Sequence, residues 1–509
     1  MGEPWGLGIG TAIVLGALIG TPALILLPAI VIVAQVVRGR AGVRFLLVIV
    51  TFTALGAGRM AMQDVPDVPP DLAESTGAHL RVETLPRTSN AGDSVLASVL
   101  QLDFETGTRP GNGMIVHIWL PEDERVAPGD ELEVAWSVTP LHMIDPGYGS
   151  YVASRGAIAE GRIWWVSSRE QGPAILHRLA DLRHHISDGL QGVLPGDAGA
   201  LASGIVTGDD SALSDAAGYA FRNTGTSHIT AVSGANVAMI LAIWNLVIPA
   251  GRNRRLIVVQ AVVIISIWMY AVLVGLEPPA LRAAIMATLI LLASRSGRRP
   301  DLLTLLAMTS AAMVLWDPGY VRAVGFWLSV VATGAIIMRV PSVAGTGWRP
   351  MLRGMLEGVA LAQIATLPVV LMTFGTWSLT SILANAILAP LIWLAFPLCF
   401  LLAAIVLVLP WIAPIVALAP VIPLNVALQI VGMLGSAMPP LDFTNAGVAG
   451  VVAITLPCVI GLALLSSETQ RWGSIVARQW RERPVALGLV LIGPAAGILA
   501  GLVFALIMA

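Results

Sequence analysis

The chain has 509 residues, of which 56% are hydrophobic and only 12% are charged, and its formal net charge is −2. Soluble domains carry about 25% charged residues, so this chain lacks the polar surface of a soluble globular protein. All 29 basic residues are arginines. The absence of lysine excludes a P-loop nucleotide site and a lysine Schiff base. Any uphill transport therefore takes its energy from a gradient or from a partner.

The chain starts with two apolar blocks, at residues 7–37 and 45–58, separated by arginines. A stretch of about 20 apolar residues is long enough to cross the hydrocarbon core of a bilayer. We therefore predict an N-terminal transmembrane hairpin over residues 1–58.

Residues 59–168 differ in composition, being polar and rich in Pro, Gly and Asp. Alternating apolar and polar runs at 79–83, 114–120 and 131–136 are typical of short strands separated by turns. Several such strands within about 100 residues predict a small all-β barrel. From Ile175 to Leu194 the apolar spacing becomes three and four residues, which predicts an amphipathic linker helix within residues 169–200.

The rest of the chain is apolar, with a transmembrane region at 201–410 and additional C-terminal transmembrane helices at 411–509. We expect spans at 229–248, 256–276, 280–294, 301–316, 323–338, 355–374, 381–409, 412–436, 447–466 and 486–508. The predicted fold is an α-helical polytopic membrane protein of about 10–13 transmembrane helices, some broken or re-entrant, with a small extracellular all-β domain. Alternating spans gather the arginine-rich loops on one side, which the positive-inside rule makes cytoplasmic.

The most unusual segment is FRNTGTSHITAVSGANV, residues 221–237, which places polar groups where a span begins. Such groups cost free energy unless they face a wet cavity or one another, and the glycines permit a broken helix. We interpret these residues as lining or shaping a path through the membrane: Arg222, Thr224, Gly225, Thr226, His228, Ser233, Gly234 and Asn236. A capped helix start with small residues at a packing interface is the alternative.

The second segment is EPPALRAAIM, residues 277–286. Arg282 lies about one turn inside a span, where an arginine costs about 2.5 kcal/mol or more. We interpret Glu277 and Arg282 as part of a path for an anion such as phosphate, with Pro278 and Pro279 forming a structural turn. An ion pair between Arg282 and Glu277, or snorkelling of Arg282 to the interface, is equally compatible.

A third segment, residues 316–335, has structural features. Asp317 and Pro318 predict a turn, and Gly325 and Ser329 permit close approach of helices.

The fourth segment, residues 362–391, contains Gln363, Pro368, Gly375, Asn385 and Pro390 within apolar sequence. Such interruptions indicate broken or re-entrant helices near a transport site, with Gln363 and Asn385 lining the path and Pro368 and Pro390 shaping it. A merely kinked span is the alternative.

Signals for catalysis are weak. No HExxH sequence, nucleophile elbow or zinc-ligand spacing occurs, and Asp209 and Asp210 are typical of helix caps. All seven histidines lie at or before His228. We therefore expect no catalytic site, no metal, no cofactor and no enzymatic activity.

In this order, the four segments resemble the membrane competence domain of the ComEC family. GIVTGD at 204–209 and the 221–237 segment are similar to the family's GLLLGD and FRxTGTxHLLAVSGLH phrases. The segments beginning at Glu277, Asp317 and Ala365 are similar to PASxxRAxxM, DPxxxxxxGFQLSFxA and ATLPLxxxxFGxxSLxGLLANLLAxP. The similarity covers residues 195–410. Upstream, residues 145–159 resemble the end of the family's extracellular OB-like domain.

The sequence also departs from the family's phrases. Asn236 stands where the commonest phrase has a second histidine, and Trp327 and Val330 stand where it has glutamine and phenylalanine. Many members end in a metallo-β-lactamase-like domain with an HxHxDH motif. No histidine follows His228, so we expect this chain to lack that domain.

The resemblance implies an inner-membrane channel that imports single-stranded DNA during bacterial natural transformation. It implies contact with single-stranded DNA and membrane lipids, and a separate DNA receptor, nuclease and cytoplasmic motor. Arginine and aromatic side chains suit a single strand, so the DNA-contact candidates outside are Arg81, Arg87, Trp119 and Trp136. A secondary transporter of a small anionic solute is the alternative function, although no convincing internal repeat occurs. A membrane-embedded hydrolase is a second alternative.

Overall fold

The computed structural model describes Pro69 and residues 71–443, except for 90–91, 122–123, 145–151, 153–156, 211, 231, 249–256, 296–301, 322 and 340–347. The described chain forms two compact units. Unit 1 includes residues 288–377 and 441–443, and unit 2 includes residues 69–287 and 378–440. The predicted N-terminal hairpin and the spans at 447–466 and 486–508 lie outside the described residues.

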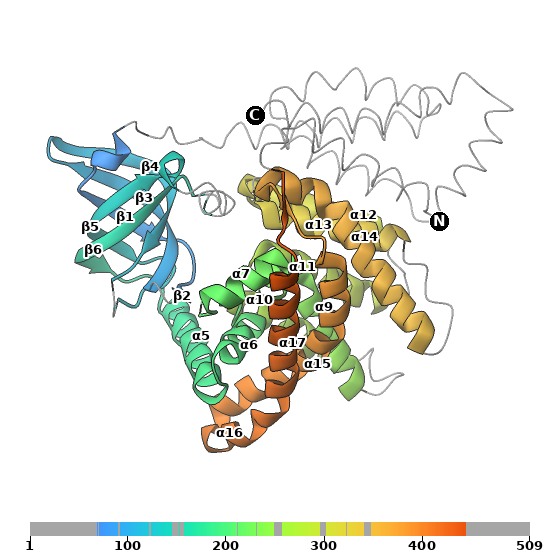
Figure 1. The fold of residues 1–509 in the computed structure, drawn as a ribbon. Helices are drawn as coiled ribbons and strands as arrows, with labels where there is room; N and C mark the ends of the chain where they lie inside the picture. Colours follow the sequence, from blue (N-terminus) through green and yellow to red (C-terminus); the bar gives the residue numbers. More distant parts are fainter. Residues whose placement is uncertain are drawn as a thin grey trace, which may run out of the picture. The chain divides into compact units, whose positions relative to one another are not determined.

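Unit 2 starts with a β-domain built on one six-stranded sheet (Figure 1). Its strands are β1 (Gly77–Val82), β2 (Arg87–Ser89), β3 (Gly92–Phe104), β4 (Gly107–Trp119), β5 (Glu131–Pro140) and β6 (Ala159–Glu170). The strand order is β1-β5-β6-β4-β3-β2, and β1 also pairs with β3, so the sheet closes on itself. Two 3-10 helices, η2 (Leu72–Glu74) and η3 (Leu141–Met143), belong to the same region.

The alternating sequence explains the burial pattern of these strands. In β5, Leu132, Val134, Trp136 and Val138 are buried, while the residues between them face outward. This two-residue period is that of a strand with one face on a core. The alternating runs predicted at 79–83, 114–120 and 131–136 fall on β1, β4 and β5 to within one residue, which confirms them.

The amphipathic helix predicted at 175–194 is confirmed as α5 (Ala174–Val193), which follows the β-domain. Helix α6 (Asp197–Thr207) packs beside it, with Ser187 Oγ 2.6 Å from Ser203 Oγ. On another side of α5, Gly189 faces Val406 of α15 (Ser381–Val408) so closely that an added Cβ would overlap the valine side chain. Small and hydroxyl-bearing residues thus let α5 pack closely on two helices.

Asp130 joins the β-domain to the start of α5. Its carboxylate is fully buried and accepts hydrogen bonds from the backbone N–H groups of Ala127 (2.9 Å) and Gly172 (2.7 Å). It also lies 2.8 Å from Arg169 Nη2 and 2.7 Å from His177 Nε2. Burial by itself raises the pKa of Asp130, but these hydrogen bonds and the arginine charge outweigh it and hold the pKa below its ordinary value.

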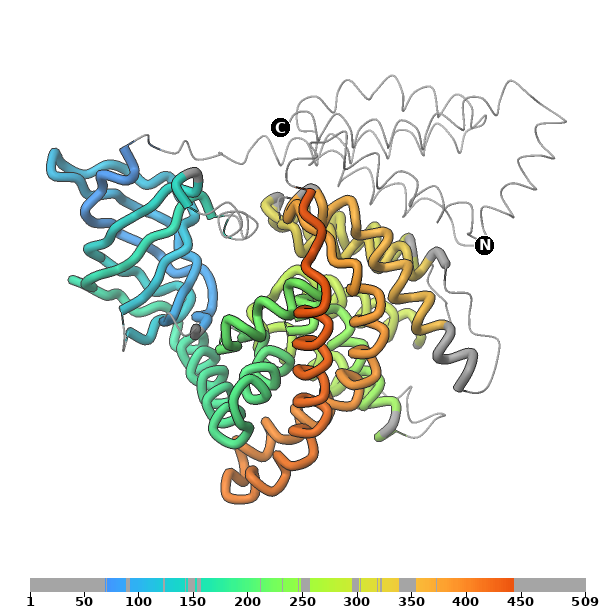
Figure 2. Tube along the Cα trace, in the orientation of Figure 1, coloured from blue at the N-terminus to red at the C-terminus, as the bar shows by residue number. Residues whose placement is uncertain are grey.

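The other helices of unit 2 bring together parts of the chain that are distant in sequence. They are α7 (Asp215–Asn223), α8 (Ser227–Thr230), α9 (Gly234–Val247), α10 (Ile257–Leu273), the first half of α11 (Pro278–Arg295), α16 (Ala413–Val416) and α17 (Leu418–Ala437), with the 3-10 turn η6 (Pro410–Ile412). Helix α17 packs against α7, as Figure 2 shows for the red and green segments.

Unit 1 contains the remaining described elements. They are the second half of α11, α12 (Leu302–Trp316), the 3-10 turn η5 (Pro318–Val321), α13 (Val324–Arg339), α14 (Trp348–Phe374), β7 (Thr376–Trp377) and β8 (Leu441–Asp442). Helix α13 packs on both α12 and α14. The short β7–β8 pair lies beside Leu367 and Leu371 of α14, which form a small cluster with Trp377 and Phe443.

Three helices of the described chain are long and apolar enough to cross a membrane, within α14, α15 and α17. Five shorter apolar helices, of 10–17 residues, fall on the spans predicted between residues 229 and 338. This is a helical membrane protein with a β-domain, in agreement with the composition.

Candidate functional site

The polar segment 221–237 forms a broken helical path in unit 2. Helix α7 ends at Asn223, the single turn α8 follows, and α9 starts only at Gly234. Gly225 has a φ of +63°, a left-handed conformation that glycine adopts without a steric penalty. The predicted break in the helix is therefore confirmed, and Gly225 permits the turn between α7 and α8.

Thr224 and Thr226 are fully buried on the inside of this turn. Their hydroxyl oxygens lie 2.7 Å apart, and the Thr224 hydroxyl also donates to the carbonyl oxygen of Ala220 at 2.9 Å. The two hydroxyls thus satisfy the end of α7, where the carbonyls lack helical partners. These two threonines therefore fit a capped helix end at a packing interface, and they do not line a path.

The turn packs against the start of α15, which carries the fourth polar segment. Asn385 Nδ2 donates to the carbonyl oxygen of Ser381 (2.8 Å) and lies 3.5 Å from the carbonyl oxygen of Gly225. A Cβ added at Gly225 would lie 2.9 Å from Ser381 Cβ. The structure therefore brings together Gly225 and Asn385, two of the predicted site residues.

The preceding GIVTGDD sequence contacts the same segment from another side. The Thr230 hydroxyl donates to the Asp210 carboxylate, and an added Cβ at Gly204 would lie 2.5 Å from the Thr230 carbonyl oxygen. Burial raises the pKa of Asp210, and the charge of Arg87 and the Thr230 hydrogen bond oppose that rise. The capping role predicted for Asp210 is wrong, because Ser214 caps α7 by accepting from Ala217 N at 3.2 Å.

At the start of α9, Asn236 is buried and paired. Its Nδ2 donates to Tyr270 Oη of α10 at 2.7 Å, and its Oδ1 accepts from Ser233 Oγ at 3.0 Å. A buried amide with both ends hydrogen-bonded stabilises the contact between α9 and α10. Asn236 thus has a structural role in addition to any part in a path.

Arg282 of α11 is only 5% exposed and lies against Gly234. A Cβ added at Gly234 would lie 2.8 Å from Arg282 Nη2, so the glycine makes room for the guanidinium group. Glu277, which was considered as an ion-pair partner for Arg282, instead forms a salt bridge of 2.6 Å with Arg87 of the β-domain. Pro278, followed by Pro279, is the first residue of α11, as expected of prolines at a helix start.

Two charged or polar candidates of this unit have accessible side chains. Arg222 near the end of α7 and His228 in α8 are both exposed. Ser233 and Gly234 are partly exposed beside them in sequence. These side chains can meet a ligand without any rearrangement of the turn.

Apart from Pro390 of α15, the remaining transmembrane candidates lie in unit 1. Gln363 and Pro368 belong to α14, and Gly325 and Ser329 belong to α13. The turn predicted at Asp317 and Pro318 is confirmed, because Asp317 Oδ1 accepts from Gly319 N at 2.8 Å.

The interruption expected within residues 362–391 occurs at a different place from the prolines. Pro368 lies inside α14 and Pro390 lies inside α15, and both helices continue through them. The chain breaks instead at Gly375, another of the predicted interruptions, whose φ is +64°, and in the short strand β7. Prolines are tolerated within apolar helices where neighbouring groups satisfy the freed carbonyls.

The four DNA-contact candidates of the β-domain differ in position. Trp136 is 4% exposed in the core, and its Nε1 donates to Ser75 Oγ at 3.1 Å, so its predicted contact with DNA is wrong. Arg87 is paired with Glu277 as described above. Arg81 is exposed, although Glu131 Oε1 accepts from its Nε and Nη2 at 2.9 and 2.6 Å. Trp119 is partly exposed, and its Nε1 donates to the Glu160 carboxylate.

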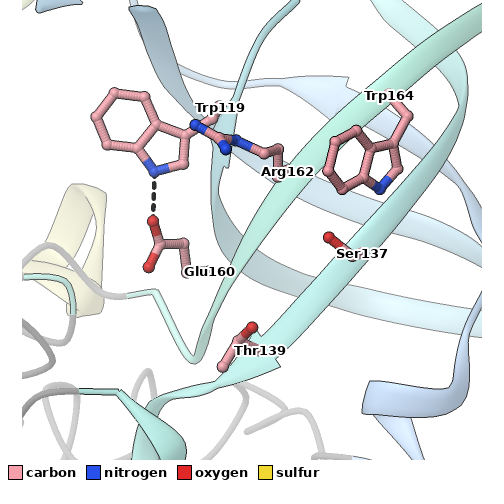
Figure 3. Close-up of a pocket in the computed structure, with 6 residues that line it drawn as sticks. All are labelled: Trp119, Ser137, Thr139, Glu160, Arg162 and Trp164. Atoms are coloured by element: carbon pink, nitrogen blue, oxygen red, sulfur yellow. Dashed lines mark hydrogen bonds between the residues drawn. The ribbon is translucent and has the colours of Figure 1, made fainter. Parts of the chain in front are cut away.

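Trp119 lines a shallow cavity of about 360 Å³ on the β-domain, shown in Figure 3. The other lining residues are Ser137 and Thr139 of β5 and Glu160, Arg162 and Trp164 of β6. Arg162 and Trp164 are not among the residues predicted from the sequence. The available signal was the GRIWW sequence at 161–165, an arginine and two tryptophans within a polar strand.

Comparison with known proteins identifies relatives of this chain. Residues 205–468 match the sequence profile of the family described as "Competence protein". The ComE operon protein 3 of Bacillus subtilis (strain 168) is 24% identical over 271 residues, which are 52% of this chain and 34% of that protein. Competence protein ComA of Neisseria gonorrhoeae is 27% identical over 268 residues, 50% of this chain and 36% of that protein.

A further relative is the uncharacterized protein YcaI of Escherichia coli (strain K12), 28% identical over 319 residues, 59% of this chain and 41% of that protein. The match thus spans between 34% and 41% of the length of these three relatives. No solved structure matches the chain.

Proposed function

This chain belongs to the competence protein family, and we propose that it takes part in DNA uptake during natural transformation, as an inner-membrane channel for one DNA strand. The names of two relatives, competence protein ComA and ComE operon protein 3, support the proposal. The matched residues include the polar segment 221–237 and both helices that pack on its turn and on Asn236.

The observation that carries the proposal is the convergence of the polar segments within one apolar bundle. Gly225 meets Asn385, Gly234 meets Arg282, and Thr230 meets Asp210, although these partners are far apart in sequence. An arginine inside an apolar helix is costly, so its position beside a helix break points to a function rather than to stability. A guanidinium group at that position suits the passing phosphates of a strand.

The topology belongs to the same proposal. The chain crosses the inner membrane several times, with its arginine-rich loops in the cytoplasm. The β-domain, an OB-like barrel, lies outside and receives the strand. Arg222 and His228, which are exposed, contact the strand near the start of α9.

The chain does not itself cut DNA in this proposal. A separate receptor captures DNA, a separate nuclease removes the second strand, and a cytoplasmic motor or a gradient supplies energy. The absence of lysine supports an external energy source, because a P-loop needs that residue.

Measurement of labelled DNA in cells with and without the gene tests the proposal. We expect DNA to bind outside the deletion strain without reaching its cytoplasm, and a plasmid copy to restore internalisation. Unchanged internalisation in the deletion strain would contradict the proposal and would favour transport of a small anion, which liposome uptake assays would then detect.

A further inference from the structure

The shallow cavity on the β-domain is built where three strands run side by side. Strand β6 lies between β4 and β5 in the sheet. Arg162 of β6 is paired in register with Trp119 of β4 on one side and with Ser137 of β5 on the other. Thr139 is likewise opposite Glu160. The cavity is therefore a continuous surface of neighbouring side chains on rigid strands.

Two indole groups and one guanidinium group form the main part of this surface. Figure 3 shows Trp119 and Trp164 on either side of Arg162. Trp164 is 63% exposed, which is unusual for so large an apolar side chain. The Trp119 indole is held by the hydrogen bond from its Nε1 to Glu160, so its orientation is fixed before a ligand arrives.

This combination fits a planar aromatic ligand that carries a negative charge nearby. Every nucleobase has a face that stacks on an indole, and a planar guanidinium group binds a phosphate or stacks on a base. The exposed hydroxyl groups of Ser137 and Thr139 can hydrogen-bond the edge of a base. The volume of about 360 Å³ is at the lower end for ligand sites, so it suits one small unit rather than a folded partner.

We propose that this cavity binds one nucleobase of an incoming single strand, stacked on Trp164 and Trp119, with the adjoining phosphate paired to Arg162. The inference rests on the proposed function and adds the residues and the mode of recognition. The Glu160 carboxylate disfavours a phosphate on its own side of the cavity, so the strand backbone runs past Arg162. Because every base can stack, recognition depends on the presence of a base rather than on sequence.

Trp165 provides a matched control. It is the next residue on β6, is 69% exposed, and is not part of the cavity lining. Trp164→Ala and Trp165→Ala each remove an exposed indole group from the same strand, so neither leaves a hole in the core. A difference between the two variants therefore reports on the cavity.

The experiment measures binding of two fluorescent oligonucleotides to the full-length protein in neutral-lipid nanodiscs. One is an oligothymidylate of about 12 nucleotides, and the other is an abasic strand of equal length and charge. We expect Trp164→Ala to weaken oligothymidylate binding by about 5- to 150-fold, since stacking of one base contributes about 1–3 kcal/mol. Binding of the abasic strand should stay unchanged, Trp165→Ala should match the wild type, and Trp164→Phe should recover part of the affinity.

Arg162→Gln tests the phosphate contact separately. It should weaken binding of both strands and reduce the slope of log affinity against log salt by about 0.7. Arg109→Gln, which changes an exposed arginine outside the cavity, serves as its control.

The proposal is overturned if Trp164→Ala binds oligothymidylate as the wild type does, if Trp165→Ala loses as much affinity, or if the wild type binds the abasic strand equally well. It is also overturned if the full-length protein binds neither strand. These outcomes are distinct from failure of the proposed function, which the internalisation assay in the deletion strain reports independently.

Discussion

Arg87 Nη2 lies 2.6 Å from Glu277 Oε1, so an ion pair joins strand β2 of the β-domain to the residue that precedes α11. The two residues are 190 positions apart in the sequence. Arg87 also acts on Asp210, whose carboxylate binds Thr230 of the polar segment. One arginine of the β-domain thus stands near two carboxylates that belong to the helical part of the same unit.

We predict that reversing either charge destabilises this junction and that reversing both restores part of the lost stability, because a glutamate at position 87 still lies near Asp210. The Arg87 and Glu277 side chains are 19% and 35% exposed, so solvent screens the pair and a coupling of about 1 kcal/mol is expected. Thermal melts of the wild type, Arg87→Glu, Glu277→Arg and the double variant give this coupling. If the double variant loses as much unfolding free energy as the two single variants lose together, the ion pair makes no net contribution to stability.

Gly234→Ala should impair DNA internalisation as Arg282→Ala does, because the new methyl group displaces the guanidinium group. The Cβ would lie 2.8 Å from Arg282 Nη2, which is buried and cannot easily move. Internalised DNA is measured together with the amount of protein in the membrane and the DNA bound outside. Gly432→Ala, where a new Cβ meets no atom within 4 Å, is the control. If Arg282→Ala lowers the protein level as much as internalisation, Arg282 is structural.

Gly225→Ala should destabilise the protein by about 2 kcal/mol or more, because a left-handed conformation costs about 1–2 kcal/mol for alanine and its Cβ also meets Ser381. Adding Ser381→Gly should recover the stability that is lost through overlap with Ser381. The loss that comes from the left-handed backbone should remain. Gly192→Ala in α5 meets no atom within 4 Å and should be neutral or stabilising. Equal stability of Gly225→Ala and Gly192→Ala would refute the account of this turn.

Asp130→Asn should cost about 2 kcal/mol at neutral pH, since it weakens hydrogen bonds and an ion pair to a buried carboxylate. Because folding lowers the pKa of Asp130, its stabilisation is complete above the unfolded pKa of about 4 and is lost as the pH falls through the folded value. Thermal melts between about pH 3 and 7 should therefore show that the variant loses less stability than the wild type on acidification. Asp188→Asn, at an exposed position of α5, should show the same dependence of stability on pH as the wild type.

Much of the fold could be predicted from sequence because its patterns are periodic. The two-residue alternation of β5 and the three- and four-residue spacing of α5 each fix a buried face, so these elements were confirmed. A barrel was predicted, but the strands that close it, β1 and β3, could not be, since their pairing depends on contacts between strands rather than on the pattern of any one strand.

The candidate site could be predicted only in part. Polar residues in apolar sequence identified the segments that converge, but residue type does not reveal which way a side chain points. Thr224 turns inward to satisfy a helix end, and Trp136 enters the β-core. Trp164 was missed because an aromatic residue in a strand usually indicates core, and only the structure places it at the surface.

Helix α15 contacts α5 through Val406 and the polar turn through Asn385. At a rise of 1.5 Å per residue, these contacts are about 30 Å apart along a single helix. A force on the β-domain, which is fastened to α5 through Asp130, can therefore reach Gly225 along α15, in addition to the direct link between Arg87 and Glu277. Pro390 and Pro397 lie between the two contacts. Each proline lacks a backbone N–H and so removes one hydrogen bond from the helix. We therefore expect α15 to bend at these two positions under such a force.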